Sequence, residues 1–376
     1  MKIWIIAGET SGDIYGARIA RELKQLNPEV EISGMGGPAM MEEGLDLMVD
    51  STELGVMGIV EVLKKYPTFK KIFKNLVAEA AEQRPDAVVL IDYPGFNLRY
   101  AAKLKELGIP VAYYISPQVW AWHKGRIPKI AKIVDKMMVI FPFEVDTYKE
   151  TDLDVEFVGH PLAELLSETP RLEEREENTI LLLPGSRFSE IDRLLKPMVQ
   201  TANELHKKYP DMRFVIPTPR PAIAQKIEDV LPSLTKNTDI FKIDNGKTTD
   251  WMARATAAIA ASGTVTVQAA LLGLPLVSVY RLNPLTYMMA TRLVKIPFFT
   301  MPNVLTGKVV YEEFVQKQVC PETLVPALEA ILPGGSRKEE VEDGMEEVVE
   351  KLGGRSGCLK RAAEAILKTV DTKKLN

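Results

Sequence analysis

The chain has 376 residues, of which 46% are hydrophobic and 26% are charged, and its formal net charge is −4. This length exceeds that of one ordinary core, so the composition predicts a soluble globular protein with two domains. The small acidic net charge excludes a global field that would draw the chain to nucleic acid, so any basic surface must be local.

Cysteine usage and hydropathy indicate the cellular compartment in which the protein is expected. The only cysteines, Cys320 and Cys358, have no metal-ligand spacing and are typical of reduced thiols. Met1 leads directly into a strand without a signal peptide, and no apolar run reaches the roughly 20 residues that cross a bilayer. We therefore expect a cytoplasmic protein that has no nucleic-acid partner and can still lie on a membrane surface.

Short apolar and β-branched runs alternate with helical segments, which predicts α/β domains with parallel, doubly wound, Rossmann-like sheets. The first-half strands are expected at Lys2–Ala7, Glu31–Met35, Ala87–Asp92, Val111–Ser116, Lys136–Phe141 and Glu156–Val158. The second-half strands are expected at Thr179–Leu183, Arg213–Pro217, Ile240–Ile243, Ala257–Ala261 and Leu276–Tyr280. The charged stretch 168–178 is typical of a linker, so we expect domains over 1–167 and 179–352. A C-terminal helix in 353–376 could pack back on the first domain.

The first predicted strand breaks at Gly8 into a small polar turn that ends near Asp13 and enters a helix. Such a turn leaves backbone N–H groups free at a helix N-terminus, where they favour an anionic or hydroxylated ligand. Ser, Thr and Asp are also the preferred helix caps, so the turn alone does not distinguish a ligand site from an N-cap.

A basic, apolar stretch follows at 58–76, where Pro67 favours a helix start. The apolar residues after it fall on one stripe, with lysines around it: Phe69, Ile72, Phe73 and Leu76, with Lys70, Lys71 and Lys74. This pattern suits an anionic membrane surface. The alternative is a stripe that packs on the sheet, as is usual in soluble α/β domains.

A candidate general base ends the strand at 87–92. A carboxylate at Asp92, on the carboxyl edge of the sheet, suits proton abstraction from a sugar hydroxyl. The alternative is an aspartate that caps a turn or helix. His123 and His160 compete for the same role, although His160 lies where the chain leaves the first domain and is typical of a hinge.

Two loops of the second half are candidates for phosphate binding. Ser186 and Arg187 end a strand, and a guanidinium there can engage two oxygens of a diphosphate. The alternative is a surface arginine capped by Glu190. Further along, Ser262, Gly263 and Thr264 also follow a strand, and their backbone amides can hold phosphate oxygens. Gln268, one turn into the next helix, is within reach of a ribose.

Other nucleotide signatures are missing from the sequence. Neither loop matches the GxxxxGK[ST] pattern of nucleoside-triphosphate hydrolysis, and the dinucleotide fingerprint GxGxxG is also missing. Asp152 and Asp154 match the DxD pattern of metal-dependent sugar transferases, but three letters carry little weight. We expect neither a metal nor a cofactor.

Taken in order, these segments resemble the lipid-A-disaccharide synthases, glycosyltransferases with the two-domain fold called GT-B. The matching segments are AGETSGD (7–13), VMGIVEVL (56–63), IDYPGFN (91–97), SPQVWAWHKGR (116–126), PFE (142–144), VGHP (158–161), LLPGSR (182–187), ASGTVTVQAALLGLP (261–275) and MPNVLTG (301–307). Several long motifs in the same order make this resemblance specific.

The resemblance implies an activity that joins UDP-2,3-diacylglucosamine to 2,3-diacylglucosamine 1-phosphate, giving lipid A disaccharide 1-phosphate and UDP. It implies a location on the cytoplasmic face of the inner membrane and leaves a homodimer open. Two alternatives remain at this point. One is another GT-B enzyme acting on a UDP sugar, such as the peptidoglycan N-acetylglucosaminyltransferase or UDP-N-acetylglucosamine 2-epimerase. The other is a non-catalytic membrane-surface binding protein.

The resemblance also implies roles for individual residues. The catalytic pair is Asp92 and Arg187. The expected donor-side residues are Ser186, Arg187, Ser262, Gly263, Thr264, Gln268 and Asn303. The expected acceptor-side residues are Gly8, Glu9, Ser11, Asp13 and Asn97. The expected membrane-facing residues are Val62, Leu63, Tyr66, Phe69, Ile72 and Phe73.

Two positions depart from the pattern of the family. Related sequences commonly carry glutamate where this chain has Gln268, which puts a charged ribose contact in doubt, although an amide can still bond a hydroxyl. The family often has a second acid where this chain has Gly95, so Asp92 is the only carboxylate of its motif here.

Overall fold

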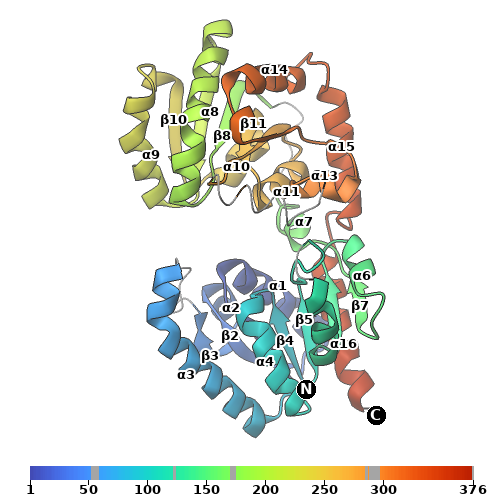
Figure 1. The fold of residues 1–376 in the computed structure, drawn as a ribbon. Helices are drawn as coiled ribbons and strands as arrows, with labels where there is room; N and C mark the ends of the chain where they lie inside the picture. Colours follow the sequence, from blue (N-terminus) through green and yellow to red (C-terminus); the bar gives the residue numbers. More distant parts are fainter. Residues whose placement is uncertain (52–58, 122–123, 170–174, 284–286, 288–296, 375–376) are drawn as a thin grey trace. The chain divides into compact units, whose positions relative to one another are not determined.

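A computed structural model of the chain describes residues 1–51, 59–121, 124–169, 175–283, 287 and 297–374, without the side chains of 59–66 and 372–374 (Figure 1). The chain forms two compact units. Unit 1 comprises Met1–Glu164 and Ser356–Asn376, and unit 2 comprises Leu165–Arg355.

Unit 1 is built on a seven-stranded sheet in which every neighbouring pair is parallel. Its strands are β1 (Lys2–Ala7), β2 (Glu31–Gly36), β3 (Asp46–Asp50), β4 (Ala87–Ile91), β5 (Val111–Tyr114), β6 (Lys136–Val139) and β7 (Asp154–Phe157). They lie in the order β3-β2-β1-β4-β5-β6-β7. From β1 the strand order runs to one edge of the sheet through β2 and β3, and from β4 it runs to the other edge. The order therefore reverses between β1 and β4. In open α/β sheets, ligands bind at the carboxyl ends of the strands beside such a switch point.

Helices cover the sheet of unit 1, and the last helix of the chain is among them. They are α1 (Thr10–Leu26), α2 (Pro38–Glu42), α3 (Ile59–Gln83), α4 (Pro94–Glu106), α5 (Ile127–Ile133), α6 (Phe143–Thr147) and α16 (Cys358–Lys374). Helix α7 (Pro161–Leu165) ends at the boundary of the unit. Helix α16 packs against α1 and against strands β4 to β6, and Figure 1 shows it in red beside strands coloured blue to green. Unit 1 is therefore completed by a segment that follows unit 2 in the sequence.

Unit 2 repeats the design with a six-stranded parallel sheet in the order β10-β9-β8-β11-β12-β13. Its strands are β8 (Glu176–Leu183), β9 (Arg213–Thr218), β10 (Phe241–Asn245), β11 (Ala255–Ala261), β12 (Leu276–Tyr280) and β13 (Glu313–Val315). Its helices are α8 (Phe188–Lys208), α9 (Pro221–Leu234), α10 (Thr248–Arg254), α11 (Thr264–Leu271), α13 (Met301–Thr306), α14 (Pro321–Ile331) and α15 (Lys338–Lys351). The switch point of this sheet lies between β8 and β11.

The expected pair of doubly wound α/β sheets is confirmed, and the structure differs from the sequence prediction mainly at its edges. Strands β3 and β13 were not predicted, because both are short edge strands whose side chains are only partly buried. Strand β8 begins at Glu176, inside the expected linker, and its first residues are exposed. Helix α3 begins at Ile59, so Pro67 lies inside the helix and does not start it.

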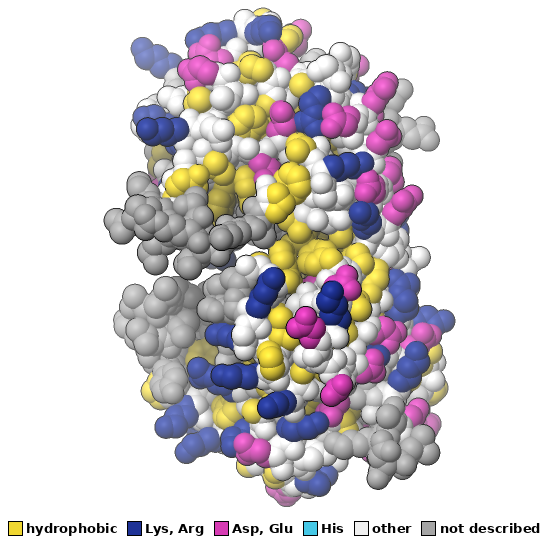
Figure 2. Space-filling model, turned by 45° about the vertical axis from the view of Figure 1, so that its right-hand side comes forward, with side chains coloured by type: hydrophobic (Ala, Val, Ile, Leu, Met, Phe, Trp, Pro, Cys, Tyr) yellow, Lys and Arg dark blue, Asp and Glu magenta, His cyan; other side chains and the backbone are white. Residues whose placement is uncertain are grey.

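Figure 2 shows basic, acidic and hydrophobic side chains interspersed in each unit on the face that it presents. Among the described residues, no helix combines the length and apolar character needed to cross a membrane.

Candidate active site

The switch point of unit 1 holds Asp92 in an uncommon backbone conformation. Strands β1 and β4 are neighbours, so the loop after Ala7 lies beside the loop after Ile91. Asp92 and Tyr93 both have positive φ, 46° and 47°, which residues other than glycine rarely adopt. Such a turn persists only where surrounding contacts hold it.

Three hydrogen bonds hold the backbone of Asp92. Its N–H donates to the carbonyl of Tyr114 at 2.9 Å. Its carbonyl accepts from the hydroxyl of Tyr113 at 2.6 Å and from Nδ2 of Asn97 at 2.8 Å. Tyr113 and Asn97 are completely buried, so the carboxylate is presented from a rigid support.

The electrostatic surroundings of Asp92 suit proton abstraction. Burial raises the pKa of its carboxyl to about 6, and the negative charge of Glu9 contributes in the same direction. At neutral pH the group is then ionised and yet more basic than an ordinary aspartate. A general base is most effective when its pKa lies near the working pH.

The opening loop of the chain forms part of this site. A Cβ at Gly8 would lie 2.4 Å from Cδ1 of Tyr93, so only glycine lets the Tyr93 ring pack against the loop. Glu9 and Ser11 are exposed beside it, at the start of α1. The structure thus places Gly8, Glu9 and Asp92 on one edge of the sheet.

Two residues expected on the acceptor side have other partners. Asp13 is 4% exposed, and its carboxylate accepts hydrogen bonds from the N–H groups of Gly37, Ala39 and Met40 at 2.7 to 3.1 Å. It therefore caps α2, and its oxygens are not available to a sugar. Asn97 is completely buried, and its Nδ2 donates to the carbonyls of Asp92 and Ile91, so it positions the backbone of the aspartate.

The competing histidines are not supported as bases. His160 is 5% exposed, and burial lowers its pKa to about 3. Its Nδ1 accepts a hydrogen bond from the N–H of Leu162 at 3.1 Å, so the neutral ring caps α7. His123 lies outside the described residues.

Part of the apolar stripe of α3 belongs to the core. The ring of Phe73 packs edge-to-face with those of Phe96 and Tyr100, at centroid distances of 5.6 and 6.1 Å. Phe69 and Ile72 are half-buried against the same core. The side chains of Val62, Leu63 and Tyr66 lie outside the described residues. The lysines at 70, 71 and 74 are exposed around the stripe.

The switch point of unit 2 forms a pocket of about 320 Å³. The loops after β8 and β11 both contribute to it, because the two strands are neighbours in the sheet. The predicted donor residues that it gathers are Ser186, Arg187, Ser262, Gly263, Thr264 and Gln268. This pocket has glycine at Gly185 and Gly263, where φ is positive and a backbone can approach a ligand closely.

The same pocket includes residues that sequence reasoning missed. Pro217 and Pro219 lie at the carboxyl end of β9, next to β8, and Thr248 begins α10. The Thr248 hydroxyl is buried without a hydrogen-bond partner among the described residues. The sequence did predict a strand at 213–217, which Pro217 ends and Pro219 follows. Only the strand order shows that this strand lies beside β8.

Arg187 contacts Glu190, the partner that the sequence offered as an alternative to a phosphate. Glu190 accepts hydrogen bonds from the N–H groups of Ser186 and Arg187 at 2.9 and 3.2 Å, and its other oxygen lies 3.3 Å from Nη1 of Arg187. The Arg187 side chain is still 79% exposed and lines the pocket. Glu190 thus occupies the positive N-terminus of α8, the kind of position that a phosphate also favours.

Asn303, which was expected on the donor side, lies in the interior of unit 2. It is completely buried, its Nδ2 donates to Tyr311 and Glu313, and its Oδ1 accepts from the N–H groups of Val310 and Tyr311. All four of its hydrogen-bonding positions are therefore filled within unit 2. Asn303 does not line the pocket; it braces the chain beside Phe299, whose carbonyl accepts from Ser262.

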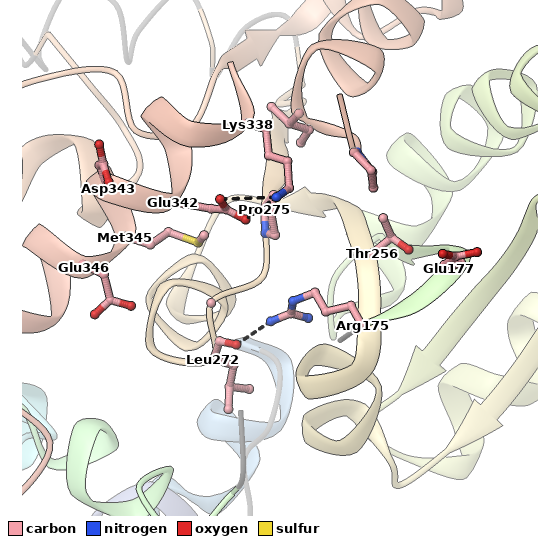
Figure 3. A pocket seen from close by; sticks show the side chains of 13 residues that line it. Arg175, Glu177, Thr256, Leu272, Pro275, Lys338, Glu342, Asp343, Met345 and Glu346 are labelled. Carbon is pink, nitrogen blue, oxygen red and sulfur yellow. Dashed lines mark hydrogen bonds and ion pairs between the residues drawn. The ribbon is translucent and has the colours of Figure 1, made fainter. Parts of the chain in front are cut away.

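A larger cavity, of about 730 Å³, lies at the opposite end of the same sheet (Figure 3). It is lined by residues near the amino ends of β8, β11 and β12, among them Glu177, Thr256 and Pro275. Arg175 points across it and donates to three backbone carbonyls, one of them that of Leu272. Since ligands of such sheets bind at the carboxyl ends, we assign this cavity no part in the reaction.

The DxD pattern forms no metal site in the part of the chain that the structure describes. Asp154 lies 3.0 Å from Nζ of Lys136, which also pairs with Glu156. No group of three or more acidic, histidine or cysteine side chains suited to a metal occurs among the described residues.

Comparison with known proteins gives one consistent family. Residues 3–368 match the family described as Lipid-A-disaccharide synthetase. A lipid-A-disaccharide synthase of Trichlorobacter lovleyi is 38% identical over 98% of both chains. One of Anaeromyxobacter dehalogenans is 39% identical over 97% of both chains.

Solved structures share the fold at much lower identity. A UDP-GlcNAc 2-epimerase of Neisseria meningitidis bound to UDP-GlcNAc has a TM-score of 0.63 and 16% identity, with 98% of this chain and 100% of that chain covered. MurG of Acinetobacter baumannii has a TM-score of 0.56 and 12% identity, with 98% and 99% covered. At these identities the likeness extends to the GT-B fold alone, whereas the whole-chain sequence match distinguishes among the enzymes that share it.

Proposed function

Because the chain belongs to the lipid-A-disaccharide synthetase family, we propose that Asp92 is the general base of its glycosyl transfer and that Arg187 binds the donor diphosphate. The enzyme joins UDP-2,3-diacylglucosamine to 2,3-diacylglucosamine 1-phosphate and releases UDP. What remains to be assigned is which residues of this chain carry each step.

In the proposed reaction, the carboxylate of Asp92 accepts the proton of the acceptor 6-hydroxyl as that oxygen attacks the anomeric carbon of the donor. The new glycosidic bond forms while the bond to UDP breaks, and the electron pair leaves with the diphosphate. A single displacement of this kind inverts the anomeric centre. The observation that carries the proposal is the rigidly held Asp92 with a pKa of about 6 at the switch point of unit 1.

The leaving group is stabilised by unit 2 in this proposal. Arg187 and the N–H groups of Gly263 and Thr264 contact the diphosphate, where negative charge develops as the bond breaks. Ser186 and Ser262 add hydroxyl contacts, and the amide of Gln268 bonds the ribose. The diphosphate displaces Glu190 from the N-terminus of α8, because both anions require the same N–H groups.

On the acceptor side, we assign sugar contacts to the exposed residues Glu9 and Ser11 and to the backbone at Gly8. These groups support the assignment because they lie beside Asp92, and because the side chains of Glu9 and Ser11 form no hydrogen bond or ion pair with another described residue.

We further propose that unit 1 rests on the anionic cytoplasmic face of the inner membrane through the neighbourhood of α3. Lys71 and Lys74 are exposed there and form no hydrogen bond or ion pair with another described residue. Each lysine close to an anionic surface contributes about 1 kcal/mol of attraction. A local contact of this kind needs no spanning helix.

Replacing Asp92 by asparagine tests the proposed base. Asp92→Asn keeps the shape and the backbone bonds but removes the proton acceptor, so kcat should fall at least ~100-fold. UDP affinity, measured by calorimetry, should stay nearly unchanged because the donor pocket belongs to unit 2. Substantial residual turnover would remove Asp92 from the role.

A further inference from the structure

Unit 1 has a cavity of about 340 Å³ that is lined by residues of α3 and α4 and by Tyr93, the residue next to Asp92. Its apolar lining comes from Phe69 and Phe73 of α3 and from Tyr93 and Phe96. The rings of Tyr93 and Phe96 stack at a centroid distance of 6.0 Å, and Phe73 meets Phe96 edge-to-face. Since Tyr93 follows Asp92 directly, this aromatic wall extends from the proposed base.

The exposed side of the cavity is basic. Lys70 and Arg99 both line it and are both exposed. Neither forms a hydrogen bond or an ion pair with another residue in the described part of the chain, whereas many other surface lysines and arginines do. An apolar cavity with two uncompensated cations beside it is complementary to a ligand that carries both a hydrocarbon chain and an anionic group.

The cavity is open at Gly95. A Cβ built on Gly95 meets no atom within 4 Å, and the residue has no positive φ, so a side chain there is tolerated by the backbone. Because Gly95 lines the cavity, we expect a bulky side chain at this position to take up part of its volume. The length of chain that the cavity admits therefore depends on this glycine.

We propose that this cavity takes one acyl chain of the lipid acceptor and that Lys70 and Arg99 bind the acceptor phosphate. The inference rests on the placement of the acceptor hydroxyl at Asp92 proposed above. The acceptor is the substrate that combines acyl chains with a monophosphate, and the cavity shares unit 1 with Asp92. The diphosphate of the donor has its own pocket in unit 2.

The proposal makes this part of unit 1 a determinant of acceptor specificity. Each methylene buried in an apolar site changes affinity by roughly fourfold, until the chain outgrows the space. Acceptors with short acyl chains should therefore bind more weakly than those with chains that fill the cavity. Acceptors without the phosphate should lose the contribution of Lys70 and Arg99.

The first experiment fills the cavity. Gly95→Leu is assayed with full-length acceptor in detergent micelles, with Gly95→Ala as the smaller matched change. We expect the KM for the full-length acceptor to rise at least ~10-fold in Gly95→Leu, with a smaller rise in Gly95→Ala. The KM for a short-chain acceptor should change little, and thermal unfolding establishes that both variants fold.

The second experiment removes the cations. Lys70→Gln with Arg99→Gln should raise the KM for the phosphorylated acceptor by about 10- to 100-fold, the usual worth of charge-assisted hydrogen bonds. The KM for the dephosphorylated acceptor should stay as it is in the unmodified enzyme. Lys129→Gln with Lys132→Gln is the control, since it removes two exposed charges from α5, which does not line the cavity.

Three results would overturn the proposal. A rise in the KM for the donor in place of that for the acceptor would assign the cavity to the donor chain. A loss of vesicle binding with unchanged KM in micelles would make it a lipid-surface contact. Unchanged kinetics in both variants would leave the cavity without a substrate. The proposed base is judged separately, because Asp92→Asn acts on kcat and these variants act on the acceptor KM.

Discussion

The two units share one sheet design but place side chains of opposite charge at their switch points. In each, the first strand of the unit lies beside the strand where the order reverses, and the loops after those two strands form the candidate site. Unit 1 places a carboxylate there, Asp92, and unit 2 places a guanidinium, Arg187. The fold thus fixes where each candidate site lies, and a few loop residues fix the charge that it presents.

The backbone at the two positions differs in the same sense. Unit 1 forces two residues other than glycine, Asp92 and Tyr93, into positive φ and holds them with buried side chains. Unit 2 uses Gly185 and Gly263, which adopt positive φ without that cost. A reacting carboxylate needs a fixed direction, whereas a phosphate pocket needs backbone that the ligand can approach.

The largest expected change in ligand affinity is that of a variant which tests whether diphosphate binding belongs to unit 2 alone. Arg187→Ala should weaken UDP binding by about 10- to 100-fold, because charge-assisted hydrogen bonds to the diphosphate are lost. Turnover should fall with it, in contrast to Asp92→Asn, which should spare UDP affinity. Calorimetric titration with UDP measures the change, and an unaltered Kd in Arg187→Ala would move the diphosphate site elsewhere.

The next largest change is expected in membrane binding, and it tests whether unit 1 makes the lipid contact. Lys71→Gln with Lys74→Gln should reduce binding to vesicles containing anionic lipid by about 30-fold, the equivalent of ~1 kcal/mol for each lysine. Sedimentation with vesicles measures the loss, and Lys129→Gln with Lys132→Gln serves as the charge-matched control. Equal losses in both pairs would show a general charge effect, and no loss would place the lipid contact away from α3.

The smallest change is expected in the pH dependence of kcat/KM, which should reflect the titration of Asp92 in unit 1. A base with a pKa of about 6 is active when deprotonated, so kcat/KM should fall as the pH drops through that value. Glu9→Gln removes a negative charge that raises the pKa of Asp92, so the acidic limb should move to lower pH, by less than about one unit. A pH–rate profile measures the limb, and a shift to higher pH would contradict the proposed electrostatics.

Sequence reasoning located the strands and the loops after them, because buried parallel strands read as apolar runs that end in glycine and polar residues. The edge strands β3 and β13 were not predicted from the sequence, since they bury only part of their side chains. Family resemblance brought most donor residues together, but the neighbouring end of β9 became visible only with the strand order.

The polar residues Asp13, Asn97 and Asn303 show the limit of such reasoning. Each lies in a motif of a functional loop, and each is buried and makes hydrogen bonds to backbone groups of the fold. A sequence shows which side chains can bond a sugar or a phosphate. It does not show which of them have already found partners inside the protein.

The return of α16 to unit 1 has a consequence for how the protein is made. The buried residues of this helix, among them Ala362, Ile366 and Val370, cover a face of unit 1 whose first strand is synthesised more than three hundred residues earlier. Unit 2 is therefore available to fold on the ribosome while unit 1 still exposes that face. Unit 1 thus begins the chain and is completed only after unit 2 has been synthesised. In its nascent form, aggregation and chaperone binding therefore compete with folding.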